Sequence, residues 1–443
     1  MGCTKQPPSP GCIYAGEHLT ACTHAYSALW GVPHLSKRNP CAQPVSLERR
    51  HIADISSNEY VVADKSDGVR YTLYLCNRNN QNFAFMVDRK LSFFQVPVAG
   101  CKRLFNGSIF DGELIWVLTP HGARSQMFLV FDVVALRGDA SIQREDYHRR
   151  LEAIRSIFDL NGRLVSSPEC ATALAKEGKI ICGGNAHGLS FRPKACFPLE
   201  QLDTLLRQIP TLPYATDGIV FTPVREAVCT GTAERMFKLK ARHTIDLEVS
   251  NGQLWLGQGG TPDTATQRVA LATVGITFKY APLFAEQLEE EVCRAHRDGA
   301  PLIIECQLLL QTEPSAPDSS NQVELHLLGV RRDKVHPNTV RTALATVTNL
   351  RENIQARELC DAQRGSYRPE LTGAVPPKPV GREVAAQGGA ELVSLVVGDV
   401  IDAQRWRSSI SHRHAVGGMA ARGLRAWSWS FFYWLPRPDR PPR

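Results

Sequence analysis

The pattern of hydrophobic and polar residues becomes regular from Leu47 onward and predicts a region rich in strands. Short apolar runs typical of strands lie at 60–63, 71–75, 83–87 and 127–134. Two other stretches, 147–158 and 199–209, space their apolar residues three and four positions apart, as an amphipathic helix does. Because strands outnumber helices and do not alternate regularly with them, the pattern favours an α+β domain over a doubly wound sheet.

A second strand-rich region begins near Ile245. Strands are predicted at 253–257, 275–279, 302–310 and 323–328, with one amphipathic helix over 283–295. Several short strands and one helix within about 110 residues are typical of a small β-barrel of the OB type. A last helix is predicted after Asn338 and Thr339, since both are favourable N-cap residues.

The two ends of the chain have a different character. Residues 1–40 carry Pro, Gly and Cys without periodicity and predict an irregular leader. Prolines near residue 376 indicate a linker, and 405–443 mixes arginines with aromatic residues. Such a mixture can bind single-stranded nucleic acid or can be a tail without function. The expected layout is a leader at 1–40, a first domain at 41–243, a barrel at 244–358 and a disordered basic and aromatic tail at 359–443.

Composition narrows the class of protein. With 43% hydrophobic and 21% charged residues, the chain is expected to be globular. No apolar run approaches the roughly 20 residues that a membrane-spanning helix needs, so no membrane partner is expected. The 13 cysteines form no Cys-x-x-Cys pair, which favours free thiols. A net charge of +7 is compatible with a polyanionic partner.

The candidate chemistry starts at the segment from Lys65 to Arg70, which reads Lys-x-Asp-Gly-x-Arg between two predicted strands. Alone, this segment could be a charged turn built on Asp67-Gly68. Five more charged or aromatic motifs follow it in order: Asp111-Gly112-Glu113, Phe131-Asp132, Asp217-Gly218, Lys238-Leu239-Lys240 and Arg331-Arg332-Asp333-Lys334. Each could be a solvated turn, but the ordered set is improbable by chance.

With these motifs the chain resembles the covalent nucleotidyltransferase superfamily of mRNA capping enzymes and polynucleotide ligases. The resemblance covers roughly residues 40–358 and is greatest to capping guanylyltransferases. The residues that carry it outside the shared core are 43–47, 85–90, 216–221, Thr244-Ile245-Asp246, and Pro337-Asn338. Ligases tend to have Glu-Gly where Asp217-Gly218 stands. One feature is ligase-like, since Leu239 stands between the paired lysines where capping enzymes usually have Trp.

The resemblance implies a fold and a reaction. The fold is a nucleotidyltransferase domain of antiparallel sheets with helices, similar to ATP-grasp proteins, followed by an OB-fold barrel. In the reaction, Lys65 takes GMP from GTP as a lysyl phosphoramidate and releases pyrophosphate. GMP then passes to the 5′-diphosphate end of an RNA. Lys65 must lose its ammonium proton to attack, and neighbouring cations favour that loss.

Roles for other residues follow from the same resemblance. Arg70 and Glu113 would hold the ribose, Phe131 would stack on guanine, and Lys194 would read the guanine O6 unless it is a plain surface lysine. The full nucleotide-binding set is Asp67, Gly68, Arg70, Arg89, Glu113, Phe131, Lys194, Asp217, Lys238 and Lys240. Magnesium or manganese is expected on Glu113 and Asp217, although either carboxylate could serve the sugar instead. Arg331, Asp333 and Lys334 of the barrel would orient the departing pyrophosphate after the barrel closes over GTP.

Two rival interpretations remain at this point, an ATP-dependent ligase and an inactive relative that binds RNA. The sequence has no His-Cys-x5-Arg loop and no Gly-rich methyltransferase loop, so RNA triphosphatase and cap methylation activities are expected on other polypeptides. The implied partners are GTP, 5′-diphosphate RNA, a separate RNA triphosphatase and the tail of RNA polymerase II. The implied location is the nucleus, or a cytoplasmic factory for a viral protein.

Overall fold

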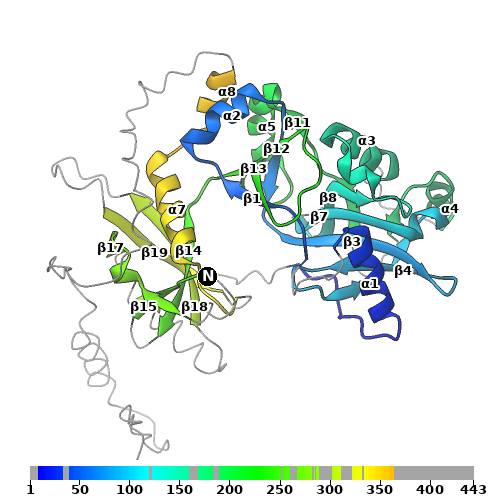
Figure 1. The fold of residues 1–443 in the computed structure, drawn as a ribbon, viewed down its shortest axis with the longest axis horizontal. Coiled ribbons are helices and arrows are strands. Elements are labelled where there is room, and N and C mark those ends of the chain that lie inside the picture. The colour runs from blue at the N-terminus through cyan, green and yellow to red at the C-terminus, as the bar shows by residue number, and fades with distance from the viewer. Residues whose placement is uncertain are drawn as a thin grey trace, which may run out of the picture. The chain divides into compact units, whose positions relative to one another are not determined.

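The computed structural model is a mixed α/β protein with three large sheets (Figure 1). It describes residues 8–32, 39–118, 122–158, 168–182, 189–250, 253–259, 267–281, 284, 286–288, 302–310, 322–331 and 334–363. The chain forms two compact units, and the first, made of 1–250 and 254–380, holds every described residue except Gln253. No helix among these residues is long and apolar enough to cross a membrane.

The first sheet has five strands and carries the Lys65 segment at the end of one of them. Its strand order is β1 (Gln43–Ser46), β13 (Thr232–Lys240), β12 (Thr216–Pro223), β2 (Tyr60–Ser66), β11 (Phe197–Pro198). Strand β12 is antiparallel to both β2 and β13, which places residues 217–218 beside residue 65 and beside 239–240. The apolar side chains of this sheet pack with helices α2 (Ile52–Ser57) and α5 (Leu202–Gln208).

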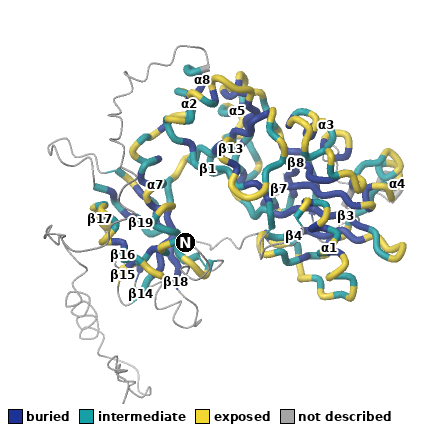
Figure 2. The backbone as a smooth tube through the Cα atoms, viewed as in Figure 1, coloured by how far each residue is buried: buried dark blue, intermediate teal, exposed yellow. Residues whose placement is uncertain are grey.

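The second sheet has six strands and is buried on both faces (Figure 2). Its order is β10 (Leu189–Pro193), β8 (Arg124–Ala135), β7 (Asn106–Leu118), β3 (Val69–Arg78), β4 (Gln81–Val87), β5 (Phe93–Gln95). Side chains alternate between the faces of a strand. Accordingly, Leu73 and Leu75 pack with helix α3 (Tyr147–Ile157), whereas Tyr74 and Cys76 pack with helix α1 (Leu19–Leu29).

Helix α1 corrects the prediction of an irregular leader over residues 1–40. Cys22, Tyr26 and Trp30 follow one another at intervals of four residues and are all buried in the core beneath the second sheet. Four-residue spacing places them on one helical face, so the helix forms to bury them. The strands predicted near 60, 71, 83 and 127 and the helix predicted at 147, which all follow the leader, are confirmed.

The third sheet follows the first two along the chain. Its order is β16 (Arg268–Ala270), β15 (Gln253–Gly257), β14 (Thr244–Ser250), β18 (Leu302–Leu310), β19 (Gln322–Val330), β17 (Thr277–Tyr280). The strands predicted at 253–257 and 302–310 are confirmed, and the one predicted at 275–279 lies slightly later. Of the helix predicted over 283–295, residues 284 and 286–288 are helical, and the remainder lies outside the described residues.

Smaller elements complete the described chain. They are η1 (Arg49–His51), β6 (Val98–Ala99), η2 (Lys102–Phe105), η3 (Ser141–Arg144), α4 (Pro168–Lys176), β9 (Ile181–Cys182), η4 (Leu199–Gln201), η5 (Ile209–Thr211) and η6 (Leu271–Thr273). The two strands in this group, β6 and β9, pair with each other as a separate two-stranded sheet.

Two helices end the described chain and return it to the first sheet. Helix α7 (Val340–Glu352) starts at the predicted N-cap Thr339, whose hydroxyl accepts a hydrogen bond from the Thr342 amide. Helix α8 (Ala356–Gln363) places Leu359 and Cys360 in the core of the first sheet. The domain boundary predicted at residue 358 therefore falls inside a packed helix. The remainder of the predicted tail, 364–443, lies outside the described residues.

Candidate active site

Lys65 is held by a carboxylate from the neighbouring strand. Its Nζ lies 2.8 Å from Oδ1 and 2.9 Å from Oδ2 of Asp217 on β12. Lys240 on β13 approaches the same carboxylate, with 3.9 Å between Nζ and Oδ2. The Lys65 side chain is 26% exposed, so it is not sealed in the core. One aspartate thus joins two lysines from different strands.

Two glycines permit this close arrangement of strands. A Cβ on Gly68 would lie 2.3 Å from the carbonyl oxygen of Leu114. Gly218 has a φ of +151°, and a Cβ there would lie 2.0 Å from the carbonyl oxygen of Leu239. A larger residue at either position would push the Lys65 segment or Asp217 away from its neighbour.

Lysines gather around the same point. Burial, followed by the charges of Lys240, Lys65 and Arg89, lowers the pKa of Lys238 to about 8. Burial, followed by the charge of Lys65, also lowers the pKa of Lys240. Because like charges placed together disfavour each other, this cluster is suited to bind an anion such as a phosphate group.

Arg70, Glu113 and Phe131 lie together on the second sheet. Arg70 and Glu113 are partners in the register of β3 and β7, and the guanidinium of Arg70 lies 5.4 Å from the ring centre of Phe131. Burial raises the pKa of Glu113 to about 7, against the opposing charges of Arg70 and Lys65. Asp111 pairs with Arg70, with 3.0 Å between Nε and Oδ1. Asp111 belongs to a sequence motif that predicts no function for it, and its two contacts with Arg70 fix the orientation of that guanidinium.

Lys194 is buried, so its interpretation as a surface lysine is wrong. Its Nζ lies 3.1 Å from Oδ2 of Asp64 and contacts the Ser66 hydroxyl, and the Tyr214 hydroxyl donates to Asp64. Asp64 and Ser66 flank Lys65 on β2. No sequence signal indicated Asp64 or Tyr214, because the contacts of Asp64 with Lys194 and with Tyr214 each join residues more than 100 positions apart.

Arg89 and the residues of the Asp67 turn complete the first group. Arg89 is exposed and donates to Oε1 of Gln43 over 3.0 Å, and its charge acts on Lys238. The Asp67 amide donates to the carbonyl of Ala215, which fixes the turn that follows Lys65.

The charged residues predicted in the second region are arranged around Asp246. Arg331 lies 3.3 Å from Oδ1 of Asp246 and 3.5 Å from Oε2 of Glu305, and Lys334 contacts Oδ2 of Asp246. Asp246 itself is buried. Asp333 lies outside the described residues. Asp246 belongs to the Thr244-Ile245-Asp246 segment. In the sequence, this segment supports the resemblance to capping enzymes but does not predict a site role for Asp246.

One cavity brings the two charged groups together. Its volume is about 250 Å³, and it is lined by residues from β13, β14, β18 and α7 and from the segment after β19. The charged lining residues are Lys238, Lys240, Asp246, Glu305, Arg331 and Lys334. The four cations outnumber the two carboxylates, and Lys238 and Lys240 have no carboxylate partner in this lining, so the cavity carries a net positive charge that is compatible with a polyphosphate.

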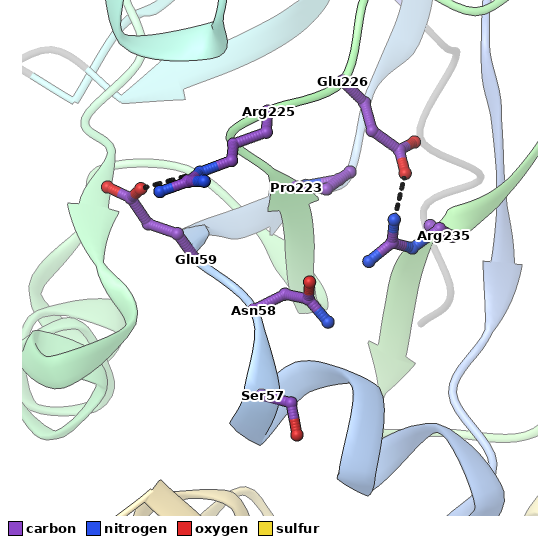
Figure 3. Close-up of a pocket in the computed structure, with 7 residues that line it drawn as sticks. All are labelled: Ser57, Asn58, Glu59, Pro223, Arg225, Glu226 and Arg235. Atoms are coloured by element: carbon purple, nitrogen blue, oxygen red, sulfur yellow. Dashed lines mark ion pairs between the residues drawn. The ribbon is translucent and has the colours of Figure 1, made fainter.

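A second hollow of about 210 Å³ lies at the opposite ends of β2 and β12 from Lys65 (Figure 3). Its arginines are each paired with a carboxylate: Arg235 with Glu226 at 2.9 Å and Arg225 with Glu59 at 4.0 Å. Lys65 lies six positions after Glu59 along the strand, a distance of about 20 Å. Since the two arginines and two glutamates of this hollow balance and it is remote from the lysine cluster, it is not the candidate site.

The carboxylates present suit a magnesium ion only in part. Among the described residues, no group of three or more His, Cys, Asp or Glu side chains could hold a metal ion. Magnesium commonly takes one or two carboxylates and completes its shell with water and substrate phosphates. Glu113 and Asp217 supply at most two such carboxylates, and both oxygens of Asp217 accept hydrogen bonds from Lys65.

Comparison with known proteins agrees with the resemblance to capping enzymes that the sequence motifs carry. Residues 21–242 match the family model described as mRNA capping enzyme, catalytic domain. The chain is similar to the mRNA-capping enzyme subunit alpha of Neurospora crassa, at 26% identity over 73% of this chain and 84% of that protein. It is also similar to the subunit alpha of Yarrowia lipolytica, at 26% identity over 73% and 81%, and to the mRNA-capping enzyme of Danio rerio, at 25% over 77% and 53%.

Among solved structures, a mycobacterial DNA ligase D complexed with ATP and MES covers 67% of this chain and 96% of its own, at 12% identity. The TM-score of 0.32 is too low to support an argument. The matched family region starts inside α1, in accord with the packing of that helix in the core.

Proposed function

The chain belongs to the mRNA capping enzyme family and is an mRNA guanylyltransferase, and we propose that Lys65 is the residue that carries GMP. In the first step the Lys65 amine attacks the α-phosphorus of GTP. A phosphorus–nitrogen bond forms, the bond to the β-phosphate oxygen breaks, and pyrophosphate leaves. Asp217, 2.8 Å from Nζ, is placed to accept the proton that Lys65 loses.

In the second step the terminal phosphate of a 5′-diphosphate RNA is the acceptor. Its oxygen attacks the phosphorus of lysyl-GMP, the phosphorus–nitrogen bond breaks, and the Lys65 nitrogen regains a proton. The product is RNA with a GpppN end. The observation that carries the proposal is the partly exposed side chain of Lys65 among Asp217, Lys238 and Lys240.

The remaining site residues divide by the part of GTP that they would contact. Lys238 and Lys240 would neutralise the α-phosphate, and Arg70 and Glu113 would hold the ribose. Phe131 would stack on guanine, and Lys194 would donate to O6 while Asp64 and Ser66 hold it. Asp67, Gly68 and Arg89 would shape the turn and rim beside Lys65.

The third sheet would act as an OB-type barrel that contributes the pyrophosphate contacts. Arg331, Asp333 and Lys334 would orient the leaving group in line with Lys65, and reopening would then admit the RNA end. Support for this part comes from the cavity that Arg331 and Lys334 share with Lys238 and Lys240. The hinge would lie near 242–248, which covers the end of the link after β13 and the first residues of β14.

Magnesium or manganese is proposed as the cofactor, held by Glu113 and Asp217 together with phosphate oxygens. When bound, such a hard cation shields the phosphate charges that repel an incoming nucleophile.

Partners and location are inferred from the relatives. Several of them are named as an alpha subunit, which supports a second subunit, and we propose that it is the RNA triphosphatase. Association with the tail of RNA polymerase II and a nuclear location would follow from mRNA capping in a cellular host.

Transfer of label from nucleotide to protein tests the proposal. The protein is incubated with magnesium and GTP or ATP labelled at the α-phosphate, then denatured, and the label that stays on the chain is counted. We expect labelling by GTP, loss of at least about 99% of it in Lys65→Ala, and no change in the matched control Lys102→Ala, an exposed lysine. Mass spectrometry should place GMP on Lys65.

The other outcomes separate the rivals. Labelling by ATP alone would indicate a ligase. Absence of labelling with either nucleotide, together with RNA binding equal in the parent and in Lys65→Ala, would indicate an inactive RNA-binding relative.

A further inference from the structure

Phe131 occupies a bulge in strand β8. Along the pairing of β7 with β8, Asp111 lies opposite Asp132 and Gly112 lies opposite Val130, so Phe131 has no partner on β7. A bulge re-aims the side chain of the extra residue, and it needs other contacts because the regular ladder is interrupted there. The orientation of the Phe131 ring therefore depends on groups outside the sheet.

A buried tyrosine supplies the first of these contacts. The hydroxyl of Tyr147, near the start of α3, donates to the backbone carbonyl of Phe131 over 2.7 Å. Tyr147 is only 3% exposed. A hydroxyl this deeply buried requires a partner, and the carbonyl at the bulge is one that a ladder would otherwise satisfy.

A buried arginine from the same helix supplies the second. Arg150, 2% exposed, donates through Nε to Oδ1 of Asp132 over 2.7 Å and through Nη2 to Oδ2 over 3.3 Å. Its Nη1 donates to the carbonyls of Glu145 and Glu226. Arg150 also stacks on Tyr147, 5.2 Å from the ring centre. The two residues after Val130 are thus both fixed by one turn of α3.

We propose that Tyr147 and Arg150 are positioning residues for the guanine seat, holding the β8 bulge so that Phe131 presents its ring to the base. This inference rests on the proposed function, in which Phe131 stacks on guanine. Neither residue need touch nucleotide, since both are buried behind the strand that carries Phe131. Arg70, on the ring side, contacts Phe131 independently of α3.

Tyr147→Phe is the discriminating change, because it removes one hydroxyl and keeps the buried ring. We expect the KM for GTP in lysyl-GMP formation to rise about three- to tenfold, the range that one neutral hydrogen bond supports. The maximal rate should change less than about twofold, so saturating GTP should restore labelling. Inhibition by pyrophosphate, which has no base, should be unchanged.

The matched control is Tyr60→Phe. Tyr60 is as deeply buried and donates its hydroxyl to Asp54 over 2.9 Å, at the far end of β2 from Lys65. Tyr60→Phe should lower the free energy of unfolding by an amount similar to that of Tyr147→Phe, but it should not alter the KM for GTP. Arg150→Lys, which keeps the charge and loses the paired contact with Asp132, should raise KM at least as much as Tyr147→Phe.

Three results would overturn the inference while leaving the guanylyltransferase intact. These are an unchanged KM and an unchanged labelled fraction in Tyr147→Phe, an unchanged KM with a lower labelled fraction in that variant, or a rise in the KM of Tyr60→Phe equal to that of Tyr147→Phe. Absence of GTP labelling in the parent protein would instead refute the proposed function itself.

Discussion

Two side chains of the site change charge close to neutral pH. The pKa of Glu113 is raised to about 7 by burial, and that of Lys238 is lowered to about 8 by burial and by neighbouring cations. A carboxyl group accepts hydrogen bonds from ribose hydroxyls more strongly when it is charged, which for Glu113 requires a pH above about 7. An ammonium that binds phosphate must also be charged, which for Lys238 requires a pH below about 8. GTP capture should therefore be best between these values.

Lys238 gives this argument a direct test. As pH rises through about 8, Lys238 loses its proton, so kcat/KM for GTP should fall roughly two- to tenfold between pH 8 and pH 9. Lys238→Arg keeps its charge at these values and should abolish the decline. The measurement is the pH profile of lysyl-GMP formation at low GTP. A variant that declines as the parent does would assign the alkaline limb to another group.

The sequence allowed candidate site residues to be named but not the residues that they contact. The lysines and acids of the motifs could be identified because their order along the chain is distinctive. Their contacts could not, because Lys65 meets Asp217, and Lys194 meets Asp64, across more than 100 residues. Asp246 shows the same limit, since only the fold brings Arg331 and Lys334 to it.

Among the secondary-structure elements, apolar patterning predicted the long strands well because each buries side chains on a sheet. Apolar patterning could not predict the order of those strands within the sheets. Strand β1 pairs in parallel with β13 almost 190 positions later, and such long-range pairing leaves no local signal. Helix α1 did leave a signal, the four-residue spacing of Cys22, Tyr26 and Trp30, which the surrounding Pro, Gly and Cys obscured.

The turn from β2 to β3 shows why its motif contains glycine. Gly68→Ala would place a methyl group 2.3 Å from the Leu114 carbonyl on β7, so the strand or the turn must move. We expect the free energy of unfolding to fall by about 1–3 kcal/mol, typical of overpacking, and lysyl-GMP formation to fall at least about tenfold. Urea unfolding and GTP labelling measure the two effects.

Gly100→Ala is the matched control for that change. Its Cβ would meet nothing closer than 3.7 Å, an ordinary contact distance. Stability should stay within about 0.5 kcal/mol of the parent and labelling should be unaffected. Equal effects at both positions would mean that the close approach at Gly68 is not what the motif requires.

In the molecule as a whole, the last two described helices contact the segment that follows β1. The side-chain amide of Asn349 on α7 donates to the backbone carbonyl of Leu47 over 2.7 Å, and Arg49 pairs with Glu358 on α8 at 2.8 Å. The Leu47 amide in turn donates to the carbonyl of Lys238. The two last helices thus contact the segment that hydrogen-bonds to β13, the strand of Lys238 and Lys240. The predicted boundaries would have assigned α7 to the barrel and cut α8 at residue 358.

Leu359 tests whether α8 belongs to the catalytic core. It is 1% exposed and packs with Leu47, Ile52 and Leu202, so Leu359→Ala should lower the free energy of unfolding by about 2–5 kcal/mol. Leu344→Ala on α7, where the side chain is 41% exposed, should cost less than about 0.5 kcal/mol. If α8 braces β13, GTP labelling by Leu359→Ala should also fail at a lower temperature than that of the parent. Equal unfolding midpoints in urea for the two variants would show that α8 does not stabilise the first sheet, and the domain would then end before it.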